Sequence, residues 1–188
     1  MGRQPLSLTP DGEVLIFQKQ FDPETGFDLY SKGMQDGAEQ LPLLATRANE
    51  FQGHLSPDGL WLAYVSDDSG QNEVYVTPFA GTGSTIPIST QGGQEPLWAP
   101  DGKELFYRTA DHVIVVDIET QPDFRASRPR ILFEDRFVPG TPYGRNYDVD
   151  RTGKRFLMIG SAATTTTSTQ IVVVQNWFNE LNDLLGEP

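Results

Sequence analysis

The stretch that decides the fold of this chain is Leu55-Ser56-Pro57-Asp58-Gly59, a tight-turn signature that occurs four times. The other copies are LTPDG at residues 8–12, WAPDG at 98–102 and, in a weaker form, VDRTG at 149–153. The glycines of successive copies are 47, 43 and 51 residues apart. A period of this length is typical of an array of small β-units rather than of one ordinary core.

The residue types in this signature are those that a reversing turn requires. Proline sets the backbone for the first corner of a type I turn, aspartate hydrogen-bonds nearby main-chain N–H groups, and glycine adopts the left-handed conformation. Such a turn joins two antiparallel strands. In the fourth copy Arg151 replaces the proline and Thr152 replaces the aspartate, which weakens the local bond. Because Gly153 is kept, we expect a turn there as well.

Apolar residues follow each turn at strand spacing. The third and fifth residues past each glycine share one face of a strand, and they are Leu15, Leu62, Leu105 and Phe156, then Phe17, Tyr64, Tyr107 and Met158. The residue between them is also apolar (Ile16, Ala63, Phe106, Leu157), which predicts a strand covered on both faces. Third strands are predicted at 27–30, 73–76, 112–116 and 170–174, and fainter fourth strands at 41–45, 85–88 and 130–133. Four strands in about 45 residues describe a β-propeller blade.

Two of these repeats resemble a known family. The stretch WAPDGKELFY at 98–107 looks like the PD-type, WD-like repeat of the TolB propeller, and so does HLSPDG at 54–59 with the strands that follow it. The segments 147–158 and 173–181 are similar to the C-termini of bacterial TolB-like propellers found behind a protein kinase or a DNA-binding regulatory domain. The resemblance covers nearly the whole chain. It implies the fold but not the function, because propellers host many unrelated activities.

We therefore predict an all-β chain, a propeller of four-stranded antiparallel blades over residues 1–188. The blades are expected at about 1–47, 48–92, 93–140 and 141–176, followed by a short C-terminal helix at 177–186. In that helix apolar residues from Trp177 to Leu185 recur at helical spacing, and Gly186 and Pro188 end it. Docking of the helix on the last blade is the simpler interpretation, and binding of a partner is the alternative.

The fourth blade has no predicted outer strand, and TolB-like propellers are expected to have six blades. We therefore expect this chain to be the C-terminal part of a longer propeller, an open arc with unpaired edges. Exposed strand edges pair with other chains, so a homodimer, or completion by upstream blades, is predicted.

The composition narrows the range of partners. With 14 basic against 26 acidic residues the net charge is −12, which opposes binding to nucleic acid or to an anionic membrane. An acidic surface serves solubility, with attraction of a cationic partner as the alternative. There is no cysteine, so disulfides and thiolate metal sites are excluded. The N-terminus lacks the apolar region of a secretory signal, and the apolar runs are too short to span a bilayer. Cytoplasm and periplasm both remain open.

The sequence contains no recognisable catalytic motif. A Gly-x-Ser-x-Gly elbow and a phosphate-binding glycine loop are both missing. The only histidines, His54 and His112, are expected to be structural, because zinc needs three or four convergent donors. The acidic loop 67–73 is interpreted as a turn, with calcium binding as the alternative. Asp148 and Asp150 could form an acid–base pair, but Asp150 is more simply a turn residue. We predict no catalytic, cofactor or metal residue.

Two further segments have a plain interpretation and a functional one. Arg125, Arg128 and Arg130 are interpreted as a solvated loop, with a patch for an anion or an acidic partner as the alternative. The threonine-rich stretch 162–169 is interpreted as a loop, with phosphorylation as the alternative.

Two functions remain. The first is a non-catalytic module that binds a protein or small ligand, and the second is the propeller of a prolyl-oligopeptidase-type serine hydrolase whose catalytic domain lies outside this chain. The short helix predicted at the end of the chain, in place of a hydrolase domain, favours the first. Binding is expected where the inner strands begin, because polar side chains interrupt the apolar columns there. The candidates are Glu50, Gln52, Gln94, Glu95, Arg145, Asn146 and Tyr147.

Overall fold

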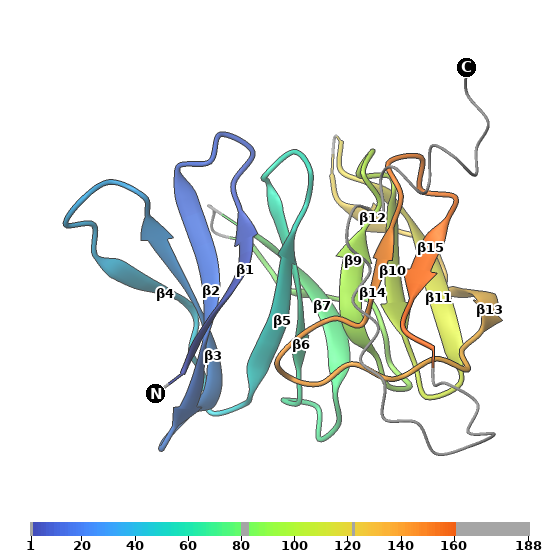
Figure 1. The fold of residues 1–188 in the computed structure, drawn as a ribbon, viewed down its shortest axis with the longest axis horizontal. Helices are drawn as coiled ribbons and strands as arrows, with labels where there is room; N and C mark the ends of the chain where they lie inside the picture. The colour runs from blue at the N-terminus through green and yellow to red at the C-terminus, as the bar shows by residue number, and fades with distance from the viewer. Residues whose placement is uncertain (1, 80–82, 122, 161–188) are drawn as a thin grey trace, which may run out of the picture.

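The computed structural model describes residues 2–79, 83–121 and 123–160, which form a series of antiparallel sheets (Figure 1). The first sheet contains β1 (Arg3–Leu8), β2 (Val14–Asp22), β3 (Gly26–Gly33) and β4 (Gln40–Leu44), paired in sequence order. The second contains β5 (Glu50–Leu55), β6 (Trp61–Ser66), β7 (Glu73–Pro78) and β8 (Ile86–Pro87), in the same order. These are the all-β, four-stranded blades that the sequence predicts.

The next two sheets vary this pattern. The third contains β9 (Gln94–Trp98), β10 (Glu104–Arg108) and β11 (His112–Glu119), and two strands pair with β11: the short β12 (Arg125–Ala126) and β13 (Arg130–Glu134). The fourth contains, among the described residues, β14 (Tyr147–Val149) and β15 (Phe156–Met158). The expected strand at 170–174, the threonine-rich stretch and the C-terminal helix lie outside the described residues.

The turn signature has the predicted chemistry. Gly59 adopts φ 75° and its N–H donates to the carbonyl of Ser56, while Asp58 accepts the N–H of Leu60. In the weaker copy the carboxylate comes from Asp150, which accepts the N–H groups of residues 152, 154 and 155. The hydroxyl of Thr152 also donates to Asp150, and this bond, followed by those from the N–H groups of Arg155 and Lys154, lowers the pKa of Asp150 to about 2. Asp150 is thus used as a turn residue.

The core lies between the sheets. Ile16, Ala63 and Phe106, the middle residues of the apolar columns, are all fully buried, as predicted for strands covered on both faces. The prediction is wrong for Leu157, which is 66% exposed. Its neighbours on β15, Phe156 and Met158, pack against the third sheet, so Leu157 points to the opposite face, which no described sheet covers.

The two ends of the sheets differ. In Figure 1 the tight turns between β1 and β2 and between β5 and β6 lie at the top, and the loop from β13 to β14, drawn in orange, crosses the lower end toward β5. Chain connections between sheets lie at 45–49, 88–93 and 135–146, and the last is by far the longest. Within the described part of the chain, no helix has the length and apolarity needed to cross a membrane.

Candidate binding cleft where the inner strands begin

Two strained residues mark the lower end of the inner strands. Gln52 on β5 has φ 54° and Glu95 on β9 has φ 56°, a left-handed conformation that is unfavourable for residues other than glycine. Each lies where the pairing register shifts: Gln52 follows Phe51 in β5, and Glu95 follows Gln94, the partner of Arg108, in β9. Such bulges take a main-chain N–H out of the strand ladder, and they are frequent beside functional sites. Gln52 and Glu95 occupy the same repeat position, five residues before the turn proline.

A relay of side chains satisfies the displaced N–H groups. The N–H of Gln52 donates to Oε1 of Gln18 over 3.0 Å, and the N–H of Glu95 donates to Oε1 of Gln52 over 2.7 Å. The N–H of Asn146 then donates to Oε2 of Glu95 over 2.7 Å. Each acceptor thus bonds the same repeat position of the next sheet. In the first sheet that position is Pro5, and Gln18 of β2 supplies the side chain instead.

Glu95 is the centre of this network. It is fully buried, and its carboxylate accepts the N–H groups of Gly140 and Asn146 as well as a 3.1 Å ion pair from Arg108. Its own carbonyl accepts the hydroxyl of Tyr147 over 2.8 Å, and burial raises the pKa of that hydroxyl. These bonds fix the fourth sheet to the third.

Arg108 carries the compensating positive charge. It is 2% exposed and also pairs with Asp135, while it donates to the carbonyls of Phe137 and Val138. Burial by itself lowers the pKa of Arg108, but the hydrogen bond to Asp135 and the charges of Asp135 and Glu95 raise it above its ordinary value. Arg108 therefore stays cationic.

A cleft of about 270 Å³ opens beside the relay. It is lined by residues of three inner strands and by the end of the long connection: Gln4, Pro5, Leu6, Gln52, Gly53, Glu95, Pro96, Gly144 and Arg145. Arg145 also borders a second hollow of about 440 Å³ that runs toward the turns, beside His54 and Trp98. One of its terminal nitrogens donates to the carbonyl of Pro96, and its buried Nε has no hydrogen-bond partner.

Five of the seven candidate residues predicted from the sequence lie in the relay or at the cleft beside it. The structure brings Gln52, Glu95, Asn146 and Tyr147 into one hydrogen-bonded network. Arg145 lines the adjoining cleft.

The other two candidates lie apart from the cleft. Glu50, the first residue of β5, is buried beside the 45–49 connection, and its carboxylate accepts the N–H and the hydroxyl of Thr46. Burial raises the pKa of Glu50 despite these bonds. Gln94 pairs with Arg108 across the β9–β10 ladder and is half-buried.

Sequence reasoning missed Gln18, Arg108 and Asp135. Gln18 and Arg108 stand six residues past their turn glycines, where the second and fourth repeats have Val65 and Ile159. A polar residue directly after an apolar run within the strand was the available signal. Asp135 gave no signal, because only the fold brings it to Arg108.

His54 has a structural role in joining two sheets. Its Nδ1 accepts the N–H of Trp98 over 3.1 Å, and its carbonyl accepts the indole N–H of the same residue. Burial, aided by the charge of Arg145, lowers the pKa of His54 to about 3. The imidazole is therefore neutral at ordinary pH.

The acidic loop 67–73 uses its carboxylates for bonds within the protein. Asp67 accepts the main-chain and side-chain N–H groups of Asn49. Glu73 accepts the side-chain amide of Gln71 and the main-chain N–H of Gly92. Within residues 2–79, 83–121 and 123–160, no three His, Cys, Asp or Glu side chains converge as metal ligands would.

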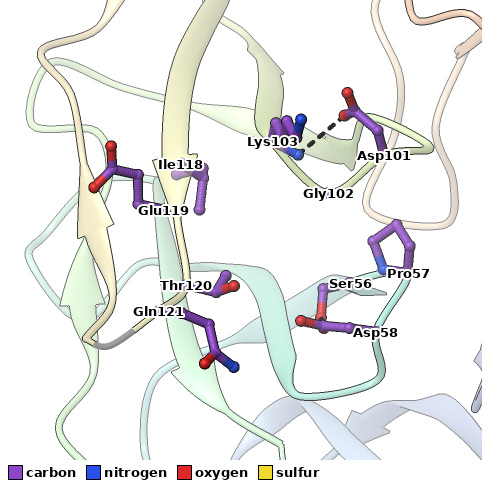
Figure 2. Close-up of a pocket in the computed structure, with 10 residues that line it drawn as sticks. All are labelled: Ser56, Pro57, Asp58, Asp101, Gly102, Lys103, Ile118, Glu119, Thr120 and Gln121. Carbon is purple, nitrogen blue, oxygen red and sulfur yellow. Dashed lines mark hydrogen bonds between the residues drawn. The ribbon is translucent and has the colours of Figure 1, made fainter.

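A separate hollow of about 490 Å³ lies between two of the tight turns and residues 118–121 (Figure 2). Two hydrogen bonds among the polar groups drawn there belong to the turns themselves: Asp101 accepts the N–H of Lys103 over 3.0 Å, and Ser56 donates to Asp58. This hollow has no counterpart of the buried relay, so the cleft at Arg145 is the stronger candidate.

Comparison with solved structures supports a TolB-like β-propeller fold. A putative TolB from Agrobacterium tumefaciens is 21% identical with a TM-score of 0.56, and the match covers 71% of this chain and 50% of that one. TolB from Acinetobacter baumannii is 15% identical with a TM-score of 0.62, covering 87% and 39%. A putative 6-phosphogluconolactonase from Bacteroides uniformis is 18% identical with a TM-score of 0.55, covering 83% and 47%.

The matched region is half or less of each of these longer chains. No family model matches the sequence, and no curated protein matches it. At these identities the likeness shows the fold alone.

Proposed function

We propose that this chain is a non-catalytic interaction module that binds a protein or small ligand in the cleft at Arg145. The observation that carries the proposal is the buried Nε of Arg145, which lacks a partner beside a cleft of about 270 Å³. Buried polar groups almost always find a partner, so an unpaired one in a cleft calls for an explanation. A carboxylate or carbonyl of a ligand would supply it, since guanidinium groups bind carboxylates through paired hydrogen bonds.

The neighbouring groups favour binding over chemistry. The carboxylate of Glu95 is held by Gly140, Asn146 and Arg108, so it is not free to act as a base. His54 is neutral and accepts a main-chain N–H. A general base needs a free lone pair within reach of a reacting proton, and neither group offers one. The arrangement is polar and its carboxylate is hydrogen-bonded, which suits recognition of a ligand.

We further propose that the chain is the C-terminal part of a larger bacterial protein. The support is the share of the solved propellers that it matches, half or less of each. Reading the genomic frame around the chain tests this proposal. An upstream kinase or regulatory domain would support it, whereas a downstream Gly-x-Ser-x-Gly domain would favour the hydrolase-associated alternative.

The binding proposal is tested by affinity capture with the tagged chain and by loss of the captured partner in Arg145→Ala. The matched control is Arg151→Ala, which removes the same charge from the same sheet at the turn end, where Arg151 is exposed. Capture that survives Arg145→Ala combined with Glu95→Gln in a folded protein would overturn the site. Peptidase substrates and 6-phosphogluconolactone should show no turnover. Turnover abolished by a point mutation in this chain would overturn the non-catalytic assignment.

A further inference from the structure

The connection between β13 and β14, residues 135–146, is held like a bound peptide. We call it the strap; in Figure 1 it is the orange loop that crosses the lower end of the sheets. The connections at 45–49 and 88–93 have five and six residues, against twelve in the strap, and they link neighbouring sheets. The strap instead reaches back to the first sheet, where Tyr143 packs against Phe27 and Phe21 with ring centroids 6.0 and 6.3 Å apart.

Side chains from three sheets form hydrogen bonds with the main chain of the strap. Glu95 accepts the N–H groups of Gly140 and Asn146, each at 2.7 Å. The side-chain amides of Gln52 and Gln18 donate to the carbonyls of residues 141 and 142, at 2.8 and 3.0 Å. Arg108 donates to the carbonyls of residues 138 and 137, at 3.0 and 3.3 Å. The four side chains that make these hydrogen bonds are at least 95% buried. Bonds to main-chain atoms do not depend on the side chains of the strap, so another segment could make them.

The strap sequence nevertheless carries one strict requirement. A Cβ on Gly140 would lie 2.6 Å from both carboxylate oxygens of Glu95, and Glu95 is itself fixed by Arg108. Only glycine fits there. Pro139 and Pro142 hold the preceding residues extended and present no N–H that needs a partner. The motif Pro-Gly-Thr-Pro at 139–142 is therefore suited to this groove in shape and in hydrogen bonding.

We propose that Gln18, Gln52, Glu95 and Arg108 form a groove for an extended proline- and glycine-containing peptide, and that residues 137–142 of the strap occupy it as an internal competitor while Arg145 stays at the cleft. This inference rests on the proposed function and names the partner class: a protein segment with a Pro-Gly-x-Pro core. The groove needs an occupant, because removal of the strap leaves the Glu95 carboxylate and the Arg108 guanidinium buried with fewer partners. A partner segment restores those bonds as residues 137–142 leave.

The test uses the full chain and a fluorescein-labelled peptide of residues 137–144, FVPGTPYG. Gly140→Val should expel the strap by its clash with Glu95, so this variant should bind the peptide at least tenfold more tightly than the native chain. The control Gly160→Val, at a position where a Cβ meets open space, should bind like the native chain. A peptide with alanine for its glycine should not compete. A folded Gly140→Val variant that binds no better than the native chain would overturn the proposal.

Hydrogen exchange on the native chain gives an independent answer, should Gly140→Val fail to fold. A displaceable segment at 137–142 should exchange the amide of Gly140 at least tenfold faster than the amides of β10 and β11. Equal protection would mean that the strap opens only with global unfolding, and the proposal would fail. Loss of a captured partner in Arg145→Ala without any peptide binding would leave the interaction module standing and reject the peptide groove alone.

Discussion

The main-chain N–H of Glu95 donates a 2.7 Å hydrogen bond to Oε1 of Gln52, a residue 43 positions earlier at the same place in the preceding repeat. Both residues have a left-handed backbone, so each bulge exposes an N–H that the previous sheet must satisfy. Hydrogen bonds between equivalent positions thus connect each sheet to the next. The sheets are therefore joined by polar contacts at this end, in addition to the apolar core between them.

Replacement of Gln52 by alanine should destabilise the fold by about 1–3 kcal/mol, because the N–H of Glu95 is left buried without an acceptor. Denaturant unfolding measures the change, with the exposed Gln35→Ala as a control expected to lie within about 0.5 kcal/mol of the native chain. Gln52→Gly separates the lost bond from backbone strain, since glycine tolerates φ 54°. If Gln52→Ala, which keeps the strained backbone but loses the bond, is as stable as the native chain, the relay bond has no energetic role.

Arg108 and Arg130 provide a matched comparison of a buried and an exposed cation. Arg108→Met leaves Glu95 and Asp135 as unpaired buried charges and should cost about 3–5 kcal/mol. Arg130→Met removes a pair with Asp117 in which both side chains are more than half exposed, and it should cost less than about 1 kcal/mol. Thermal and denaturant unfolding of both variants checks the difference. Equal losses would contradict the assignment of Arg108 as the central cation.

Titration of His54 should lower the free energy of unfolding as the solution is acidified. Its pKa is about 3 in the fold, below the ordinary value of 6.5, so the unfolded chain binds a proton first. The free energy of unfolding should therefore fall as pH drops from 6.5 toward 3, by up to about 1.4 kcal/mol per pH unit from this residue. In His54→Asn an amide oxygen can accept the N–H of Trp98 without titrating. As the pH falls from 6.5 to 5, the native chain should lose more unfolding free energy than His54→Asn does. The stability advantage of the native chain over this variant should therefore decrease. A His54 NMR titration near pH 6.5 would contradict the prediction.

The face of the β14–β15 sheet that carries Leu157 should promote self-association. Leu157 is 66% exposed and Ile159 is 52% exposed, and exposed apolar faces and strand edges both favour contact with another copy. Light scattering on the purified 188-residue chain should show dimers or larger species. Leu157→Lys together with Ile159→Lys should shift the chain toward a monomer, while Arg151→Ala should not. A monodisperse native monomer would show that this face does not associate.

The sequence predicted much of the fold because its signals are local. Proline, aspartate and glycine act within five residues, as the bonds from Asp58 to Leu60 and from Gly59 to Ser56 show. Apolar residues at every second position then predict the strands on either side of each turn. Part of the site was also predictable: Gln52, Glu95 and Asn146 share one repeat position and interrupt the apolar columns. Glu50 met the same criterion, yet it bonds to Thr46 instead.

What the sequence by itself determined is the period, the turns and the four-stranded sheets, because each follows from residues close together in the chain. Only the tertiary structure decided which polar side chains meet. Gln18 reaches the carbonyl of Pro142 across 124 positions, and Arg108 reaches Asp135 across 27. Burial makes these contacts consequential, since a charge or amide removed from water must find a partner. No local pattern encodes which partner that is, because the choice depends on how one sheet is stacked on the next.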